Sequence, residues 1–427
     1  MSRAVFAGHE ATQGWAEIAQ PADMVAELSA ALFPSALRRR DQRRRAEQYV
    51  RGLLAVDGRK SMRRIATIVG GGAAEQSLHH FIAGSTWDWS SMREELARYL
   101  QDVMPPQAWV VQPMAIPKVG EHSVGVDRRF VPQLGQSANG QQAFGVWFAS
   151  EEMSAPVNWR LHLPDHWVRN EERRRRAEIP DEAVAETLDE CASAAVLESM
   201  LKWRIPRVPV VLGATGADVR ATVLRHRAAE VPLLVRISGA TGLAVADPSM
   251  PGFGAGRLTA QQILDSVRAL RRPVEWTDPD GGRGTMRDSL VVAARVVLPD
   301  AAPRPRRTGA GQPQGLLLVG EWRDRDPRRP PTDFWLTSMV RTPVPALLRL
   351  TKLTRRVARD SATVGDQVGL RDFEGRSFRG WHRHVTLASI AHTARTLADA
   401  SHLPGYRGFG GTGVGVGGGM YAAGMPA

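Results

Sequence analysis

The sequence predicts an α/β protein with a helical N-terminal part, and two patterns support this prediction. Short apolar runs typical of buried strands occur at residues 108–111, 144–149, 157–163, 208–212 and 233–237, and helical stretches lie between them. Such alternation is typical of a layered α/β fold. Before these runs, residues 22 to about 105 show helical patterns. A chain of 427 residues with 43% hydrophobic side chains is long enough for two or three domains with buried cores.

The N-terminal part contains a candidate helix-turn-helix. Residues 37–54 predict an arginine-rich helix with Tyr49, Leu53 and Leu54 on one face. Residues 61–66 and 74–81 predict two further helices, separated by a glycine turn at residues 70–72. Helix, tight turn and helix are compatible with a DNA-binding motif, although many helical hairpins share the pattern. The arginine run fits a solvated helix face and a DNA contact equally well.

The C-terminal half predicts further strands and helices. Residues 240–335 are rich in Gly, Pro and Arg, with strand patterns at 289–298, 316–319 and 334–336, and we interpret them as a β-rich insertion. A helix is expected from Pro345 to about Gly365 and another near Trp381. The predicted organisation is a helical N-terminal DNA-binding domain (1–105), a core (106–239 and 336–400), the insertion (240–335) and a glycine-rich tail expected to be disordered (401–427).

Charge and cysteine content narrow the function classes. Lys and Arg number 56 against 44 Asp and Glu, a net charge of +12, which makes the surface attractive to phosphate. A genome rich in G and C would explain the preference for Arg over Lys, but not the excess of positive charge. The single Cys191 excludes an intrachain disulfide, and we expect it to be buried and inert. With no secretory signal or apolar run of membrane-spanning length, a cytoplasmic, nucleoid-associated protein is expected.

Four ordered segments carry a resemblance to a known family. They are residues 78–88, 117–126 (PKVGEHSVGV), 159–167 (WRLHLPDHW) and 369–384 (GLRDFEGRSFRGWHRH). Together they resemble DDE transposases of the IS701 type, within the broader IS4-like group, over roughly residues 35 to 395. The resemblance implies an RNase H-like core with a mixed sheet, interrupted by the β-rich insertion. It also implies three carboxylates that hold two divalent metals for phosphodiester cleavage and strand transfer.

The positions that match the three family carboxylates hold no acid. The first acidic pair corresponds to Gln112 and Pro113, the second position to Gly213, and the third to Ala358. Hard divalent cations require oxygen ligands, and above all anionic ones. We therefore predict no metal, no cofactor and no nuclease activity. Because the apolar strands and the motif blocks are retained, co-option of the scaffold is favoured over a decaying remnant.

The favoured hypothesis is an inactive, transposase-derived protein that binds double-stranded DNA and regulates transcription. We expect it to form a homodimer and to have no membrane partner. Its candidate DNA contacts are Arg38, Arg39, Arg40, Arg43, Arg44, Arg45, Arg63, Arg64, Lys118, Arg160, Arg376, Arg379 and His382. Core packing is the expected role of Trp159, Trp167 and Trp381. One alternative is an active nuclease that uses displaced acids such as Asp127, Asp218 and Asp360. The other is a scaffold or a repurposed protein that keeps only the fold.

Overall fold

A computed structural model describes residues 20–131, 135–213, 218–280, 285–299, 315–324, 326 and 329–400. The predicted disordered tail, 401–427, lies outside the described residues. No described helix combines the length and the apolar character needed to cross a bilayer. Cys191, Trp159, Trp167 and Trp381 are all buried, which confirms the packing roles expected of them.

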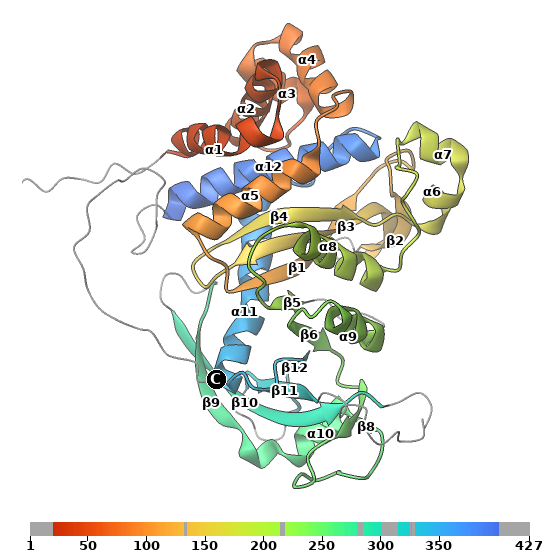
Figure 1. Ribbon diagram of the computed structural model, residues 1–427, viewed down its shortest axis with the longest axis vertical. Coiled ribbons are helices and arrows are strands. Elements are labelled where there is room, and N and C mark those ends of the chain that lie inside the picture. Colours follow the sequence, from red (N-terminus) through yellow and green to blue (C-terminus); the bar gives the residue numbers. More distant parts are fainter. Residues whose placement is uncertain are drawn as a thin grey trace, which may run out of the picture.

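The helical prediction for residues 22–105 is confirmed. Five helices form a layer at one end of the molecule (Figure 1). They are α1 (Pro21–Ala36), α2 (Arg40–Ala55), α3 (Met62–Val69), α4 (Gly72–Ala83) and α5 (Trp89–Val103). The C-terminal helix α12 (Phe378–Ala400) contacts α1, α2, α4 and α5 on one side and strand β4 on the other. The helical layer and the sheet are therefore joined through a helix from the far end of the described chain.

Glycine makes the turn between α3 and α4. Gly70 ends α3 and Gly71 precedes α4, with φ angles of 154° and 72°. The value at Gly71 lies in the left-handed region, which other residues adopt only with strain. The amides of both glycines donate to the Ala66 carbonyl, at 3.0 and 2.8 Å. The predicted helix-turn-helix pattern is thus a real helical hairpin with a two-residue turn.

A single twelve-stranded mixed sheet runs through the rest of the protein, in the order β2-β3-β1-β5-β6-β12-β11-β10-β7-β8, with β4 beside β3 and β9 beside β10. Strand β1 is antiparallel to β3 and parallel to β5, which is parallel to β6. This agrees with the mixed sheet expected for an RNase H-like fold. The strands are β1 (Ala108–Pro117), β2 (Asp127–Val131), β3 (Gln136–Ala149), β4 (Ser154–Leu161), β5 (Val210–Leu212), β6 (Leu233–Ile237), β7 (Gly242–Val245), β8 (Leu258–Thr259), β9 (Arg272–Thr277), β10 (Met286–Val297), β11 (Leu316–Trp322) and β12 (Asp333–Thr337).

The strands of segment 240–335 continue the core sheet. Strand β12 pairs with β6 in antiparallel fashion, with Phe334 opposite Ile237, and β11 and β10 follow in order. The strand patterns at 289–298, 316–319 and 334–336 therefore correspond to β10, β11 and β12. Because the two halves share one sheet, this β-rich segment is fixed relative to the strands that precede it (Figure 1).

Two helices cover the sheet around strands β1 and β5, which carry two of the positions that match the family carboxylates. Helix α8 (Leu188–Lys202) packs on β1, β3 and β4, and α11 (Val344–Asp360) packs on β1, β5, β9 and β10. A π-helical turn (Ser361–Gly365) follows α11. The remaining helices are α6 (Asp165–Arg169), α7 (Glu171–Arg176), α9 (Val219–Ala228), α10 (Ala260–Ser266) and the short 3-10 turn η2 (Arg268–Leu270).

Candidate nuclease site and nucleic-acid interface

The first two family positions are neighbours at the carboxyl ends of adjacent parallel strands. Val111 of β1 pairs with Leu212 of β5, so the next residue of each strand, Gln112 and Gly213, follows in the same register. Neighbouring strands lie about 4.8 Å apart. Side chains at these two positions would therefore be within reach of one metal centre.

Helix α11 brings the third position to the same place. A methyl group added at Gly213 would lie 3.1 Å from Cγ2 of Thr354 on this helix. Ala358 follows Thr354 by four residues and so lies one turn further on the same face. Because helical side chains point back towards the N-terminus, a long side chain at position 358 would extend towards Thr354 and Gly213. The fold therefore places Gln112 and Gly213 side by side and packs α11 against Gly213 through Thr354.

The residues at these positions do not fit two divalent metals. Gln112 offers one neutral carbonyl oxygen, and the side chains of Gly213 and Ala358 offer none. Among the residues that the structure describes, no group of three or more His, Cys, Asp and Glu side chains is arranged to hold a metal ion. No step that depends on a metal can be assigned to these residues.

The nearest acid along α11 belongs to a different end of the sheet. Asp360 is buried, and its carboxylate accepts hydrogen bonds from the amide and hydroxyl of Ser154, at 3.0 and 2.8 Å. Ser154 pairs with Ala149, which pairs with Ala108 at the start of β1. Four residues of strand, about 13 Å, separate that row from Gln112. Burial raises the pKa of Asp360, although its hydrogen bonds with Ser154 oppose this shift.

Of the other two candidate acids, one caps a helix and one lies far from Gln112. Asp218 caps α9, and its carboxylate accepts the amide of Ala221 at 2.8 Å. Asp127 lies opposite Gly140, which pairs with Pro117, five residues along β1 from Gln112. That separation corresponds to about 17 Å of strand. Asp127 and Asp360 thus lie on opposite sides of Gln112, too far apart to share one pair of metals.

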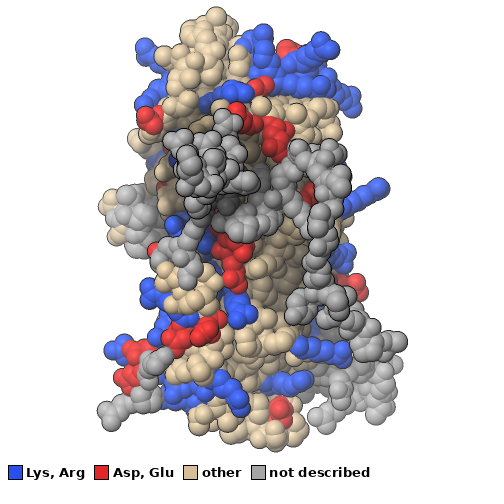
Figure 2. Space-filling model, turned by 90° about the vertical axis from the view of Figure 1, so that its left-hand side faces the viewer, with Lys and Arg blue, Asp and Glu red and all other residues tan. Residues whose placement is uncertain are grey.

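The arginines predicted on the N-terminal helices form an exposed basic surface. Arg38, Arg39, Arg40, Arg44 and Arg63 are exposed, and none forms an ion pair with a carboxylate in the described part of the chain. We call these five residues the arginine rim. Figure 2 shows basic side chains gathered at the upper end of the molecule, where the N-terminal helices lie. The exposed Asp41 lies among these arginines without pairing with them, and the excess of uncompensated cations favours binding to a polyanion.

Three other predicted arginines of this region are engaged locally. Arg43 donates from Nε to the Leu37 carbonyl at 2.8 Å, and Arg45 donates to Gln48 at 3.0 Å. Arg64 is exposed and donates to the Arg59 carbonyl at 3.1 Å. Backbone and amide acceptors leave the positive charge of each guanidinium uncompensated, so these arginines still add to the basic field.

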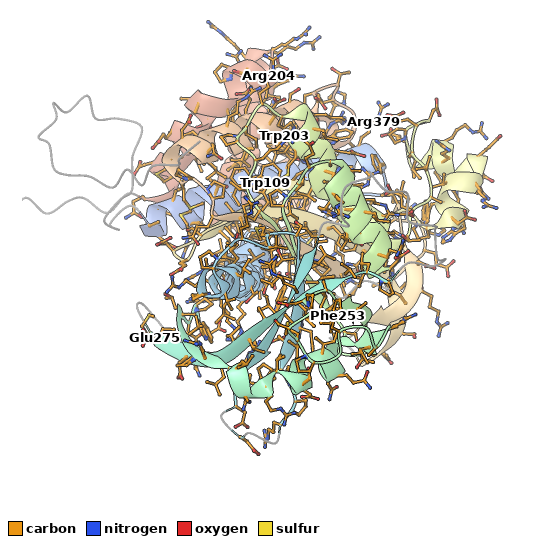
Figure 3. All side chains as sticks on the ribbon, turned by 60° about the horizontal axis from the view of Figure 1, so that its bottom comes forward. Trp109, Trp203, Arg204, Phe253, Glu275 and Arg379 are labelled. Carbon is orange, nitrogen blue, oxygen red and sulfur yellow. The ribbon has the colours of Figure 1, made fainter. Side chains whose placement is uncertain are left out.

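The predicted DNA contacts in the core differ in solvent exposure and in whether an acidic partner compensates their charge. Lys118 is half-buried and donates to the Phe373 carbonyl at 2.6 Å, and burial lowers its pKa to about 8. Arg160 donates to both carboxylate oxygens of Glu186, at 2.8 Å each, and to Glu198 at 3.0 Å, so its charge is compensated. Arg376 and Arg379 are exposed, and Figure 3 marks Arg379 near the start of α12. Only the last two present an unengaged cation to solvent.

The prediction that His382 contacts DNA is wrong. Its side chain is buried, its ring stacks on Trp89 with centroids 5.1 Å apart, and Nδ1 lies 3.0 Å from Nη2 of Arg93. Burial and the neighbouring Arg93 and Arg160 hold the pKa of His382 well below its usual range. A neutral, enclosed imidazole cannot reach a phosphate.

Arg93 was not among the residues predicted from the sequence, although it is a buried cation that joins α5, β4 and α12. From α5 it donates to the Thr386 hydroxyl at 2.7 Å, to the Asn158 side chain and the Trp159 carbonyl at 2.9 and 2.8 Å, and to His382. Each of its partners is neutral, and burial lowers its pKa to about 9. It borders a pocket of 410 Å³ at the junction of α5, β4, α8 and α12. The sequence signal was a charge on the apolar stripe of α5, in helical spacing with Leu96, Ala97 and Leu100.

Comparison with known families agrees with this geometry. The family model described as "DDE superfamily endonuclease" matches residues 32–291, which include the N-terminal helices from the end of α1 and the core strands up to β10. No curated protein matches the chain.

Proposed function

Because this chain belongs to the DDE superfamily of endonucleases, we propose that it is a catalytically inactive member that binds duplex DNA and regulates transcription. The four resembling segments favour descent from transposases of the IS701 type. The observation that carries the proposal is that none of three residues is a carboxylate: Gln112 and Gly213, which lie side by side at the ends of β1 and β5, and Ala358 on the helix packed beside Gly213.

The loss of the acids changes what the groove does to DNA. In a two-metal site, the cations activate the attacking oxygen and stabilise the leaving oxygen, and carboxylates hold those cations in place. Without carboxylates, the strand ends of β1 and β5 provide neither function. They also no longer repel the phosphates of a bound duplex, so binding without cleavage is favoured.

The basic surface can contribute favourable free energy to the binding of DNA. The arginine rim carries five uncompensated cations, and the chain as a whole has a net charge of +12. Contacts between such cations and phosphates release condensed counterions, which makes DNA binding strongly dependent on salt. If all five rim residues neutralise a phosphate, affinity should fall about 500-fold between 50 and 200 mM salt.

The test measures binding and cleavage on the same DNA. Purified full-length protein is titrated into a fluorescent duplex at several salt concentrations, and the duplex is then incubated with Mg²⁺ or Mn²⁺ and separated on a denaturing gel. We expect tight, salt-sensitive binding and no nicked or joined product. Cleavage would support an active nuclease with displaced acids instead, and an absence of binding would support a scaffold. Size-exclusion chromatography with and without DNA tests the proposed homodimer.

A further inference from the structure

We infer that α4 is the helix that contacts base edges in the major groove of duplex DNA, with Gln76 and His79 as the specificity-determining residues. This inference rests on the proposed DNA binding and adds to it the element and the side chains that select a sequence. The exposed face of α4, the chemistry of that face and the arginines beside it support this inference.

Helix α4 is amphipathic, and its polar face is open to solvent. Ala74, Leu78, Phe81 and Ile82 are buried against the helical layer. The opposite face consists of Gly72, Ala73, Gln76, His79 and His80, all exposed. The described part of the chain therefore leaves one complete face of this helix uncovered.

The chemistry of this face suits a base edge better than a protein core or an acidic partner. A glutamine amide can donate and accept at once, which matches N6 and N7 of adenine. An imidazole can donate to, or accept from, groove edges in either neutral tautomer. Gly72 and Ala73 have no bulk in the first turn, so the helix end can approach the groove floor closely. No carboxylate lies on the exposed face to repel phosphates, because the only acid of α4, Glu75, is half-buried.

Two residues of the arginine rim lie beside the C-terminal end of α4. Nε2 of Gln42 donates to the Ser85 hydroxyl at 3.3 Å, which places the first turn of α2 beside the end of α4. Arg40 and Arg44 belong to that part of α2. Arg63 lies in the first turn of α3, and the eight residues of that helix lead through the glycine turn to the start of α4.

The dimensions agree with a helix in a groove between two phosphate backbones. Twelve residues make α4 about 18 Å long, and Arg63 lies about 10 Å of helix before the turn. The major groove is about 12 Å wide. Arg40 and Arg44 at one end of α4 can meet a phosphate backbone while the polar face of the helix meets the base pairs.

A buried cation holds α4 in a fixed position on the core. Arg383 of α12 donates to the carbonyls of Ile82 and Ala83 at the end of α4, at 3.1 and 3.2 Å. It also donates to the Trp87 carbonyl at 3.3 Å. These bonds satisfy carbonyls that a helix C-terminus leaves without partners. A helix held in this way can contact bases in one defined orientation.

The test separates base contacts from phosphate contacts. The full chain selects its preferred duplexes from a randomised library, and selection is repeated with Gln76→Ala and His79→Ala. We expect a short preferred motif for the parent protein. Each variant should lose preference at one or two base pairs by about 5- to 150-fold, with an unchanged salt slope. The double variant Arg40→Ala/Arg44→Ala should instead weaken binding to all sequences and reduce the salt slope by about 2.

A matched control and a folding check make the outcomes decisive. Gln261 is an exposed glutamine on α10, at the far end of the sheet, and Gln261→Ala should leave the motif and the affinity unchanged. Thermal midpoints close to that of the parent protein would show that the surface variants are folded. If Gln76→Ala and His79→Ala select the parental motif with parental affinity, the inference is overturned while DNA binding stands. If the parent protein binds no duplex, the proposed function falls, and the inference falls with it.

Discussion

Restoring three carboxylates should give this protein the metal site that its fold still outlines. The perturbation is the combined variant Gln112→Asp, Gly213→Asp and Ala358→Glu. Gly213 is not among the glycines with a left-handed backbone, so aspartate is conformationally allowed there. Its Cβ, however, would lie 3.1 Å from Cγ2 of Thr354. Such overpacking costs about 1–3 kcal/mol. The companion change Thr354→Ser removes that methyl group and retains the hydroxyl that donates to Thr351 at 2.7 Å.

The expected stabilisation by metal follows from mass action. A ligand that binds only the folded state stabilises it by RT ln(1 + [L]/Kd). If the restored site binds Mg²⁺ with a Kd of about 1 mM, 10 mM Mg²⁺ contributes about 1.4 kcal/mol. With an unfolding entropy of about 2.1 cal/mol/K per residue, that corresponds to a rise of about 1.5 °C in the thermal unfolding midpoint of this 427-residue chain.

Differential scanning fluorimetry with and without MgCl₂ or MnCl₂ measures this effect. The matched control carries Gln112→Asn, Gly213→Asn, Ala358→Gln and Thr354→Ser, which reproduce the shape of the restored site without its charge. We expect a metal-dependent rise for the carboxylate variant and none for the amide variant or the parent protein. If the carboxylate variant gains nothing, the three positions do not converge as described. An equal rise in the parent protein would mean that it holds metal with other acids.

Three further predictions concern the groups that hold the fold together. Burial lowers the pKa of His384 to about 4, so its contribution to stability is complete above pH 6.5 and is lost as the pH falls towards 4. The loss should be about 2 kcal/mol at pH 5, and equal denaturation midpoints at pH 7.5 and pH 5 would contradict it. Arg93→Met should lower the free energy of unfolding by about 3 kcal/mol because it leaves buried acceptors unsatisfied. The control variant Arg98→Met breaks only partly exposed ion pairs with two glutamates on the same helix, so it should lower the free energy of unfolding by less than about 1 kcal/mol. Equal effects of Arg93→Met and Arg98→Met in urea denaturation would refute the role assigned to Arg93. Lys352→Met should cost about 3 kcal/mol because it leaves Glu321, buried beneath it, without its lysine partner. The added change Glu321→Gln should recover part of that loss in the same assay, and an unchanged stability would exclude the pair as a stabilising contact.

Local patterns in the sequence predicted individual elements well and their assembly poorly. The glycine turn at residues 70–72 and the apolar runs of β5 and β10 carry their own signals, namely turn chemistry and periodicity. The pairing of Phe334 with Ile237 carries none, because it joins strands that are distant in sequence and adds only non-local contacts. The sequence therefore indicated a β-rich segment, but it could not indicate that this segment continues the core sheet.

Prediction of the candidate site had a similar limit. The resemblance to family motifs singled out Gln112, Gly213 and Ala358, and strand register places the first two side by side, with α11 packed beside Gly213 through Thr354. The solvent exposure of a side chain was harder to predict from the sequence than the element on which it lies. His382 lies in a motif block beside exposed Arg379, yet the two side chains point into different environments on α12. Residues only three apart on a fully packed helix end can differ in this way, and a motif does not show which one faces solvent.

The bonds that join the helical layer to the sheet do not involve the three positions that match the family carboxylates. Carboxylates gathered for metals repel one another when no metal is bound, so their replacement by neutral residues removes a cost to folding. The bonds that join the helical layer to the sheet are made elsewhere, by Arg93 and Arg383, and neither depends on Gln112, Gly213 or Ala358.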